Sequence, residues 1–393
     1  MGLGPLAAVF PDTARVTPGG HLVIGGVDTV GLAREFGTPL YVFCEETLRA
    51  RCRAYLSAFR RLHAETVVAY ACKAYINPAL ARLFQEEGLG LDVVSGGELA
   101  VARAVGFPPE RVYFHGNNKS PQVLEEALDY GVGRVVVDNL TELGLMEEGA
   151  GRKGRAQPIL LRVNPGVDPH THAYTTTGVV DSKFGLPLAT GQAREAVRRA
   201  LVSPSLRLVG LHFHLGSPIF ELEPYALAIG VVLEWTASLR EEGLRAEEVS
   251  PGGGFAIPYL RGQRAPSPDE YAGAIVGALR EGCERWGLPL PRLVVEPGRA
   301  IVGPAGVALY TVGSVKAIPG VRTYVAVDGG MGDNIRPALY GARYEVLVAN
   351  KADAPEAAAM TIVGKYCESG DVLVRDVPLP PVEAGDLIAL PAA

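Results

Sequence analysis

Short runs of β-branched and apolar residues recur along the middle of the chain and limit the folds open to it. Eight runs alternate with amphipathic segments whose apolar side chains recur every three or four residues. The runs span 66–73, 91–95, 111–116, 134–138, 158–165, 206–217, 247–254 and 292–299. Because the runs are apolar on both faces, helices must cover both faces of the sheet they form, as in parallel sheets. Eight βα units over about 230 residues predict a closed (β/α)8 barrel, the TIM barrel.

After residue 300 the pattern changes to short strands without helices between them. These strands are expected at 306–318, 323–330, 359–364, 371–377 and 386–392. Two N-terminal runs, 21–27 and 39–45, also have strand composition and precede the first barrel unit. We therefore predict an α/β protein of two domains. A TIM barrel would occupy 46–300, and a smaller all-β domain, an antiparallel barrel or sandwich, would combine 1–45 with 301–393.

Composition narrows the class of function. The net charge of −6 leaves no basic field for a polyanion, so we expect no nucleic-acid partner. No apolar stretch approaches the ~20 residues of a membrane helix, and the N-terminus lacks a signal-peptide pattern, so we expect no membrane association. Five cysteines without a CxxC pair fit reduced thiols and a cytoplasmic location. The composition therefore favours chemistry on a small molecule.

Polar side chains stand at or just after the carboxyl end of each predicted barrel strand, where barrel enzymes build their active sites. Lys73 ends the first strand, and an amine there can act as a nucleophile, although a lone lysine would only snorkel to solvent. The glycines at 252–254 let backbone N–H groups approach a phosphate. Glu296 could pair with a protonated pyridine nitrogen, or simply with Arg299. Pyridoxal phosphate needs such a lysine, ring partner and phosphate cradle.

His212 and His214 lie two residues apart on the sixth predicted strand and therefore face the same way. They could form a metal pair, but the sequence shows no carboxylate or third histidine at a matching position, so we expect no metal site. One imidazole could instead stack on a flat cofactor while Ser217 donates a hydrogen bond to its phosphate. His212 would then be a packed core residue.

A family resemblance rests on eight motifs that occur in order along the chain. They are YACKAY, LDVVSGGEL, VDPHTHAYTTTGVVDSKFG, GLHFHLGSPI, PGGGFAIPY, EPGRAIV, DGGMGDNIRPALY and VGKYCESGDVL. With them the chain resembles the fold-type III pyridoxal-phosphate decarboxylases, and specifically the diaminopimelate decarboxylases. Ser250 departs from this pattern, because the family more often has aspartate there, and we expect the site to tolerate it.

The resemblance implies a role for each candidate residue. The catalytic residues would be Lys73, which holds pyridoxal 5′-phosphate, Cys367 as proton donor, and His214, which stacks on the ring that Glu296 binds at nitrogen. Further cofactor contacts would come from Asp92, Arg162, Ser217, Gly253, Gly254, Gly298 and Arg299. The far end of the substrate would meet Arg299, Arg336, Tyr340 and Glu368. Cys367 and Glu368 would reach in from the partner subunit of a homodimer.

The implied reaction is decarboxylation of meso-2,6-diaminopimelate to L-lysine and CO2, the last step of lysine biosynthesis. The alternatives are a decarboxylase of another basic amino acid, such as ornithine, arginine or lysine, and a non-catalytic homologue. Arg299 and Arg336 favour the first, because guanidinium groups match a distal carboxylate and would repel a distal ammonium. The family continues into a GAY-type stretch beyond the point where this sequence ends, at Ala393. We expect either an incomplete sequence or a site that lacks one wall.

Overall fold

The computed structural model describes residues 2–168 and 181–392 and divides into two compact units. The barrel unit comprises 52–256 and 266–299, and the β unit comprises 1–51, 257–265 and 300–393. The helices α2 (Glu45–Leu62) and α10 (Arg299–Val302) each contain a boundary between the units. Across the described residues, no helix combines the length and the apolar character that crossing a membrane requires.

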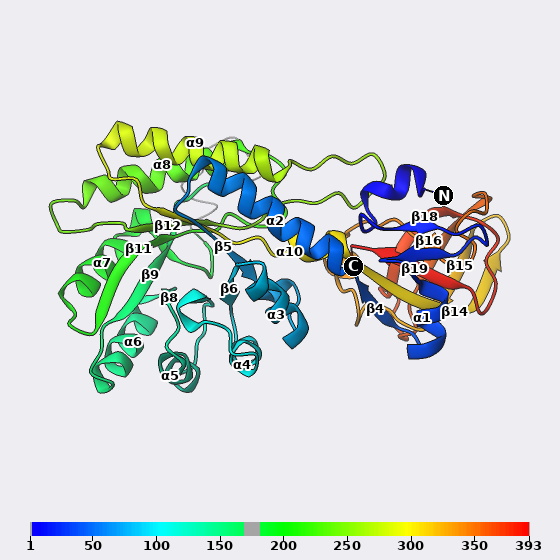
Figure 1. The fold of residues 1–393 in the computed structure, drawn as a ribbon, viewed down its shortest axis with the longest axis horizontal. Coiled ribbons are helices and arrows are strands. Elements are labelled where there is room, and N and C mark those ends of the chain that lie inside the picture. Colours follow the sequence, from blue (N-terminus) through cyan, green and yellow to red (C-terminus); the bar gives the residue numbers. More distant parts are fainter. Residues whose placement is uncertain (1, 169–180, 393) are drawn as a thin grey trace. The chain divides into compact units, whose positions relative to one another are not determined.

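The barrel unit is a closed ring of eight parallel strands (Figure 1). In order around the ring the strands are β5 (Thr66–Ala71), β6 (Gly90–Val93), β7 (Val112–Phe114), β8 (Arg134–Val137), β9 (Gln157–Asn164), β11 (Leu206–His212), β12 (Glu248–Gly252) and β13 (Arg292–Val295). β13 pairs with β5 and closes the ring, and the short β10 (Leu186–Pro187) pairs with β9. All eight predicted runs form strands, which confirms the (β/α)8 prediction.

Helices cover the outside of the ring (Figure 1). They are α3 (Pro78–Glu86), α4 (Gly96–Ala104), α5 (Pro121–Tyr130), α6 (Leu140–Arg152), α7 (Gln192–Val202), α8 (Glu223–Ser238) and α9 (Pro268–Trp286). Five of them begin at a capping side chain that accepts a backbone N–H of the first turn, which fixes where each helix starts. The caps are Asn77, Ser95, Ser120, Asn139 and Ser267.

The amino ends of the barrel strands meet at a buried ion cluster. The Glu248 carboxylate, 2 % exposed, accepts hydrogen bonds from Arg134 and from Arg292, the latter at 3.0 Å. Tyr113 contributes its hydroxyl at 3.4 Å. A carboxylate buried this deeply requires such partners. An active site is therefore expected at the opposite end of the barrel, at the carboxyl ends of the strands.

The long strand β14 (Gly306–Ile318) organises the β unit. In its sheet the order is β16 (Leu347–Val348), β19 (Leu387–Pro391), β14, β15 (Arg322–Val327), β17 (Ala358–Val363) and β18 (Val372–Leu379), and β4 (Leu40–Phe43) also pairs with β14. β15 and β17 run parallel, so the sheet is mixed, whereas we expected only antiparallel pairs. The helices of this unit include α1 (Thr29–Phe36) and α11 (Arg336–Tyr340).

A small second sheet lies at the N-terminal end of the β unit. It contains β1 (Arg15–Val16), β2 (Leu22–Ile24) and β3 (Val27–Asp28), all antiparallel. The run at 21–27, which we expected as one strand, is therefore split between two. The reason is a turn at Gly25 and Gly26, both of which have positive φ, the conformation that glycine adopts without strain.

Residues 257–265 belong to the β unit although barrel elements precede and follow them in the chain. Arg261 attaches this segment to the β unit. Its Nε and Nη2 donate to one oxygen of Glu345 at 3.1 and 3.0 Å, and its backbone N–H donates to the other oxygen at 2.9 Å. Tyr259 packs edge-on against Tyr344 with 5.3 Å between the ring centres. This short segment is thus fixed to residues more than eighty positions further along the chain.

Candidate active site

A cavity of about 590 Å³ opens at the carboxyl ends of the barrel strands. Four residues predicted from the sequence line it: Lys73, Arg162, His214 and Glu296. His115, one of the polar residues predicted at the strand ends but without an assigned role, lines it as well. The cavity therefore lies at the rim where the strand ends predicted a site.

Lys73 stands just beyond the first barrel strand. The strand β5 ends at Ala71, and a short 3-10 turn, Cys72–Ala74, carries the lysine onto the rim, where its side chain is exposed. Gly298 packs against this strand end, and a Cβ there would lie 3.0 Å from the Ala71 carbonyl oxygen. The first strand is thus two residues shorter than predicted, and the amine is accessible from the cavity.

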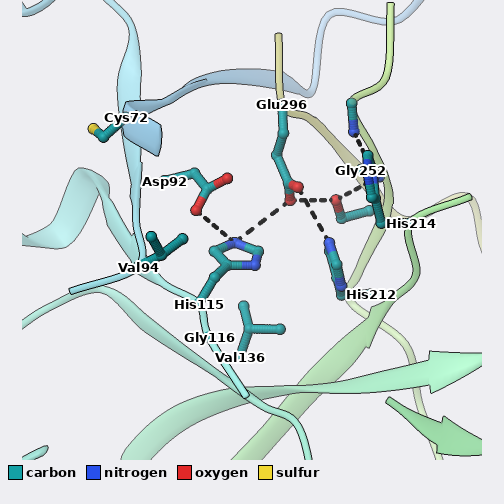
Figure 2. A network of polar contacts seen from close by, with 12 residues as sticks. Cys72, Asp92, Val94, His115, Gly116, Val136, His212, His214, Gly252 and Glu296 are labelled. Carbon is teal, nitrogen blue, oxygen red and sulfur yellow. Dashed lines mark hydrogen bonds and ion pairs between the residues drawn. The ribbon is translucent and has the colours of Figure 1, made fainter. Parts of the chain in front are cut away.

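Glu296 follows β13 and is the centre of a buried polar network (Figure 2). His212 Nε2 donates to one carboxylate oxygen at 3.1 Å, and Ser250 Oγ donates to the other at 2.7 Å. His115 Nε2 lies 3.6 Å from the second oxygen. Burial opposes the charge, but His212, His115 and the two hydrogen bonds outweigh it and hold the pKa of Glu296 well below its usual range. Glu296 is therefore an ionised carboxylate at the cavity wall.

Three buried polar atoms of this network have no hydrogen-bond partner within residues 2–168 and 181–392. They are Asp92 Oδ1, His115 Nε2 and His212 Nδ1. Burial raises the pKa of the Asp92 carboxyl to about 8 and lowers the pKa of His115 and His212. Buried polar atoms without partners are rare in folded proteins, so these three indicate a ligand with polar atoms.

His115 and Glu296 are the third histidine and the carboxylate that the sequence did not place beside His212. The ligand atoms of these three residues lie within 4.8 Å of one another, so the set could also hold a metal ion. However, His212 Nε2 already carries the proton that it donates to Glu296, and that nitrogen cannot ligate a metal while protonated. The absence of a metal remains a prediction.

His214 packs against the glycine loop that follows β12. Its Nδ1 accepts the backbone N–H of Gly253 at 3.3 Å, so the neutral ring carries its proton on Nε2. Burial, reinforced by the charge of Lys73, lowers the pKa of His214 to about 3, and the ring is therefore neutral at physiological pH. The sequence predicted this histidine at the cavity, and the structure places it there.

The loop needs glycine at two positions for steric reasons. A Cβ on Gly253 would lie 2.0 Å from the Glu296 carbonyl oxygen. Gly254 has φ +95°, and a Cβ there would lie 2.3 Å from the Gly216 carbonyl oxygen. The glycine loop therefore lies directly against the residue that precedes Ser217. The backbone of the glycine loop and the exposed residue Ser217 are thus neighbours, the arrangement that we predicted for a phosphate cradle.

Arg162 forms another part of the cavity wall. Its guanidinium carbon lies 4.4 Å from the ring centre of Phe184, and Nη1 lies 3.7 Å from the Asp138 carboxylate. Asp138 Oδ1 also accepts the backbone N–H of Gly185 at 3.1 Å. Burial lowers the pKa of Arg162, although Asp138 opposes the shift. The side chain is therefore held in place before any ligand binds.

A buried ion pair supports the loop at 116–118, which lines the cavity and which was not predicted from the sequence. Lys119 Nζ donates to the Gly116 and Val136 carbonyls, each at 2.8 Å, and to Glu142 Oε1 at 2.6 Å. Burial lowers the pKa of Lys119 and raises the pKa of Glu142. One feature of the sequence could have indicated this ion pair: Lys119 is one of only seven lysines and closely follows the third barrel strand.

Of the remaining predicted residues, Arg299 is the last residue of the barrel unit, and Arg336, Tyr340, Cys367 and Glu368 belong to the β unit. Cys367 and Glu368 are exposed on a loop that Asp371 fixes from within. Asp371 is 3 % exposed, and its two carboxylate oxygens accept the backbone N–H groups of Met331 at 2.6 Å and Tyr366 at 2.9 Å. The motif at 167–185 lies largely outside the described residues, which exclude 169–180.

The chain is similar to known proteins over most of its length. The family model described as "Pyridoxal-dependent decarboxylase, pyridoxal binding domain" matches residues 45–303, most of the chain and the whole of the barrel unit. Fold, cavity and family model together define a pyridoxal-dependent decarboxylase, as the sequence motifs predicted.

Relatives narrow this class. A diaminopimelate decarboxylase of Actinosynnema pretiosum subsp. auranticum is 50% identical over 377 residues, 95% of this chain and 82% of the relative. That of Bacillus subtilis is 46% identical over 379 residues, 96% of this chain and 86% of the relative. The structure of the enzyme from M. jannaschii in co-complex with L-lysine has a TM-score of 0.90 and 36% identity, and the match covers 97% of this chain and 87% of the other. The chain belongs to the diaminopimelate decarboxylase family.

Proposed function

We propose that this protein removes CO2 from meso-2,6-diaminopimelate and releases L-lysine, with pyridoxal 5′-phosphate bound in the barrel cavity. The observation that carries the proposal is the ionised, hydrogen-bonded Glu296 at the wall of the cavity that Lys73 also lines. Family membership supports the same reaction, and a relative that binds L-lysine has the same fold. L-lysine is the product that the proposed reaction yields.

The residues around the cavity fit this cofactor. Lys73 would supply the amine that holds it, and Glu296 would bind its ring nitrogen, where a carboxylate keeps a proton in place. The orphaned atoms of Asp92 and His115 would then gain polar partners. The other contacts would come from Arg162, His214, Ser217, Gly253, Gly254, Gly298 and Arg299. When bound, the cofactor supplies an electron-withdrawing ring that accepts the electrons left behind as CO2 departs.

The chain's own residues prepare the site for this chemistry. His212 and Ser250 orient the Glu296 carboxylate by donating one hydrogen bond to each oxygen. Because these bonds favour the ionised form, the carboxylate keeps its charge at physiological pH. The neutral His214 ring offers a flat apolar face without adding a positive charge near Lys73. Ser250, which we expected the site only to tolerate, therefore has a role of its own in orienting Glu296.

The β unit, together with Arg299 of the barrel unit, would recognise the substrate, and the β unit would return the proton. Arg299, Arg336 and Tyr340 would bind the distal carboxylate, Glu368 the distal ammonium, and Cys367 would protonate the reacting carbon. Cys367 is an exposed free thiol, as a proton donor must be, which fits the reducing cytoplasm as the place of action.

We further propose that Cys367 and Glu368 serve the cavity of a partner subunit in a homodimer. Large apolar side chains are exposed on the same unit, including Leu339 at 62%, Tyr340 at 72% and Tyr366 at 43%. Large apolar side chains exposed to this extent favour a surface that another protein covers. Sedimentation of the purified protein tests for the homodimer that this proposal requires, and a monomer at assay concentrations would contradict the proposal.

Two measurements test the proposed reaction. Borohydride reduction of the holoenzyme followed by peptide mapping should place the cofactor on Lys73, and a label on any other lysine would refute the assignment. Turnover should then be compared among diaminopimelate, lysine, ornithine and arginine, with CO2 release as the readout. Comparable rates on substrates without a distal carboxylate would favour a broader basic amino-acid decarboxylase. Bound cofactor with no CO2 released from diaminopimelate would favour a non-catalytic homologue.

A further inference from the structure

Arg336 begins the helix α11 and is enclosed by two tyrosines of the β unit. Its Nη1 donates to the Tyr344 hydroxyl at 2.6 Å. The guanidinium carbon lies 4.6 Å from the ring centre of Tyr259 and 5.6 Å from that of Tyr344. The two rings meet edge to face, with an angle of 84° between their planes. A cation over tyrosine faces is stabilised by the ring quadrupole, so both rings favour this one position of the guanidinium group.

The two tyrosines are themselves fixed. Tyr344 is 3% exposed and Tyr259 is 8% exposed. Glu345, next to Tyr344, accepts three hydrogen bonds from Arg261, which lies two residues after Tyr259. A charge-assisted pair with several bonds has little freedom to rearrange. The rings therefore form a preformed holder rather than surfaces that adapt to Arg336.

One edge of the Arg336 guanidinium group remains available. Within residues 2–168 and 181–392, the Tyr344 hydroxyl is the one acceptor that its side chain reaches, and no carboxylate lies within ion-pair distance of it. The Nε and Nη2 N–H groups form the parallel fork that matches the two oxygens of a carboxylate. A cation that is held firmly but not neutralised is suited to binding an anion.

We infer that Tyr344 and Tyr259 are positioning residues that hold Arg336 with this fork free for the distal carboxylate of the substrate. The inference rests on the proposed function, in which Arg336 binds that carboxylate. This holder, Tyr344 and Tyr259, would set specificity, because the positioned Arg336 contributes binding energy only to an amino acid with a second carboxylate at its far end. L-lysine retains this carboxylate after CO2 leaves the other end, whereas cadaverine, 1,5-diaminopentane, lacks it.

Steady-state kinetics of the holoenzyme test the holder. Tyr344→Phe removes the acceptor but keeps the ring, and we expect the KM for diaminopimelate to rise about tenfold with kcat within about twofold, since a hydrogen bond to a charged group is lost from binding. Tyr259→Leu removes one ring face and should act in the same direction. Tyr324→Phe is the matched control, because Tyr324 lies beneath Arg322 in the same unit, at 6.0 Å, and should leave KM unchanged.

Inhibition by the two amines separates positioning from a general loss of structure. The inhibition constant of L-lysine should rise with KM in Tyr344→Phe, while that of cadaverine should stay within about twofold. An equal rise for both amines would overturn the inference, because the effect would then not depend on the carboxylate. Circular dichroism and the melting temperature verify folding, and Tyr259→Leu decides the matter where Tyr344→Phe does not fold.

A double-mutant cycle distinguishes failure of the inference from failure of the proposed function. Arg336→Lys should itself raise KM. Adding Tyr344→Phe to that variant should raise KM by less than about a further twofold, because the tyrosine acts through the guanidinium group that is then missing. If Arg336→Lys leaves KM unchanged, the proposed role of Arg336 is wrong. The positioning inference is wrong if Arg336→Lys raises KM but Tyr344→Phe does not. It is also wrong if Tyr344→Phe raises KM by the same factor in the wild-type protein and in the Arg336→Lys variant.

Discussion

The buried pair of Lys119 and Glu142 allows a quantitative prediction of stability. Lys119→Met keeps the length of the apolar stem but removes the charge and all three hydrogen bonds of Nζ. Glu142, 4% exposed, would lose its cation, and the carbonyls of Gly116 and Val136 would lose their donor. Glu142 and the Val136 carbonyl are buried where water cannot replace the missing partner, whereas Gly116 is partly buried and lines the cavity.

Removing one partner of a buried ion pair typically costs about 3–5 kcal/mol. We expect the lower end, about 3 kcal/mol, for two reasons. Glu142 keeps its bond from the backbone N–H of Asp138 at 3.2 Å. Burial already raises the pKa of Glu142, so the carboxyl can take up a proton at moderate cost once Lys119 is gone. For a domain of 150–250 residues this corresponds to a fall of about 6–12 °C in melting temperature.

Thermal unfolding followed by circular dichroism measures the effect. Lys119→Met combined with Glu142→Leu should recover most of the loss, because an apolar pair can replace a buried ion pair at little cost. Lys153→Met is the matched control: Lys153 pairs with Asp129 on the surface, and such exposed pairs contribute little to stability. A fall of less than about 2 °C for Lys119→Met, or a double variant as unstable as the single one, would refute the reasoning.

Two further predictions concern pH and the loop of the β unit. Between about pH 6.5 and 5, the unfolded chain binds three protons that buried His115, His212 and His214, with lowered pKa values, exclude. Asp92, with a raised pKa, holds one proton that the unfolded chain releases, so the unfolded chain binds two more protons than the folded chain. Urea titrations of the cofactor-free protein should therefore show stability falling by about 2.7 kcal/mol per pH unit as pH drops, and Asp92→Asn should make this slope about half as steep again; a flat profile would contradict the assignment. Asp371→Asn replaces one of the two carboxylate oxygens that accept backbone N–H groups by an NH2 donor, which should loosen the loop bearing Cys367. We expect kcat to fall about tenfold while the affinity for the cofactor stays unchanged. An unaltered kcat would show that the loop does not need this anchor.

The sequence predicted the barrel and its rim because both depend on local patterns. Apolar runs and amphipathic periods identify strands and helices one at a time, and parallel strands bring their carboxyl ends to one rim. Lys73, His214 and Glu296 could therefore be assigned to a common site from these local patterns alone.

Contacts that depend on which strands become neighbours were beyond this reasoning. His115, His212 and Glu296 are separated by about eighty to one hundred residues in sequence, and ring closure brings their ligand atoms within 4.8 Å. Ser250 was noticed only as a departure from a family pattern, although its hydroxyl orients Glu296. The parallel pairing of β15 with β17 likewise leaves no mark in the alternation of either strand.

The segment 257–265 means that this protein cannot be divided by a single cut. The chain passes between its two units four times, at 51/52, 256/257, 265/266 and 299/300. A recombinant fragment with the limits of the family match, 45–303, would carry Tyr259 and Arg261 but lack Tyr344 and Glu345. Its Arg261 would lose the carboxylate that now accepts three of its hydrogen bonds. Gene fusion or exchange of parts would therefore have to transfer both units together.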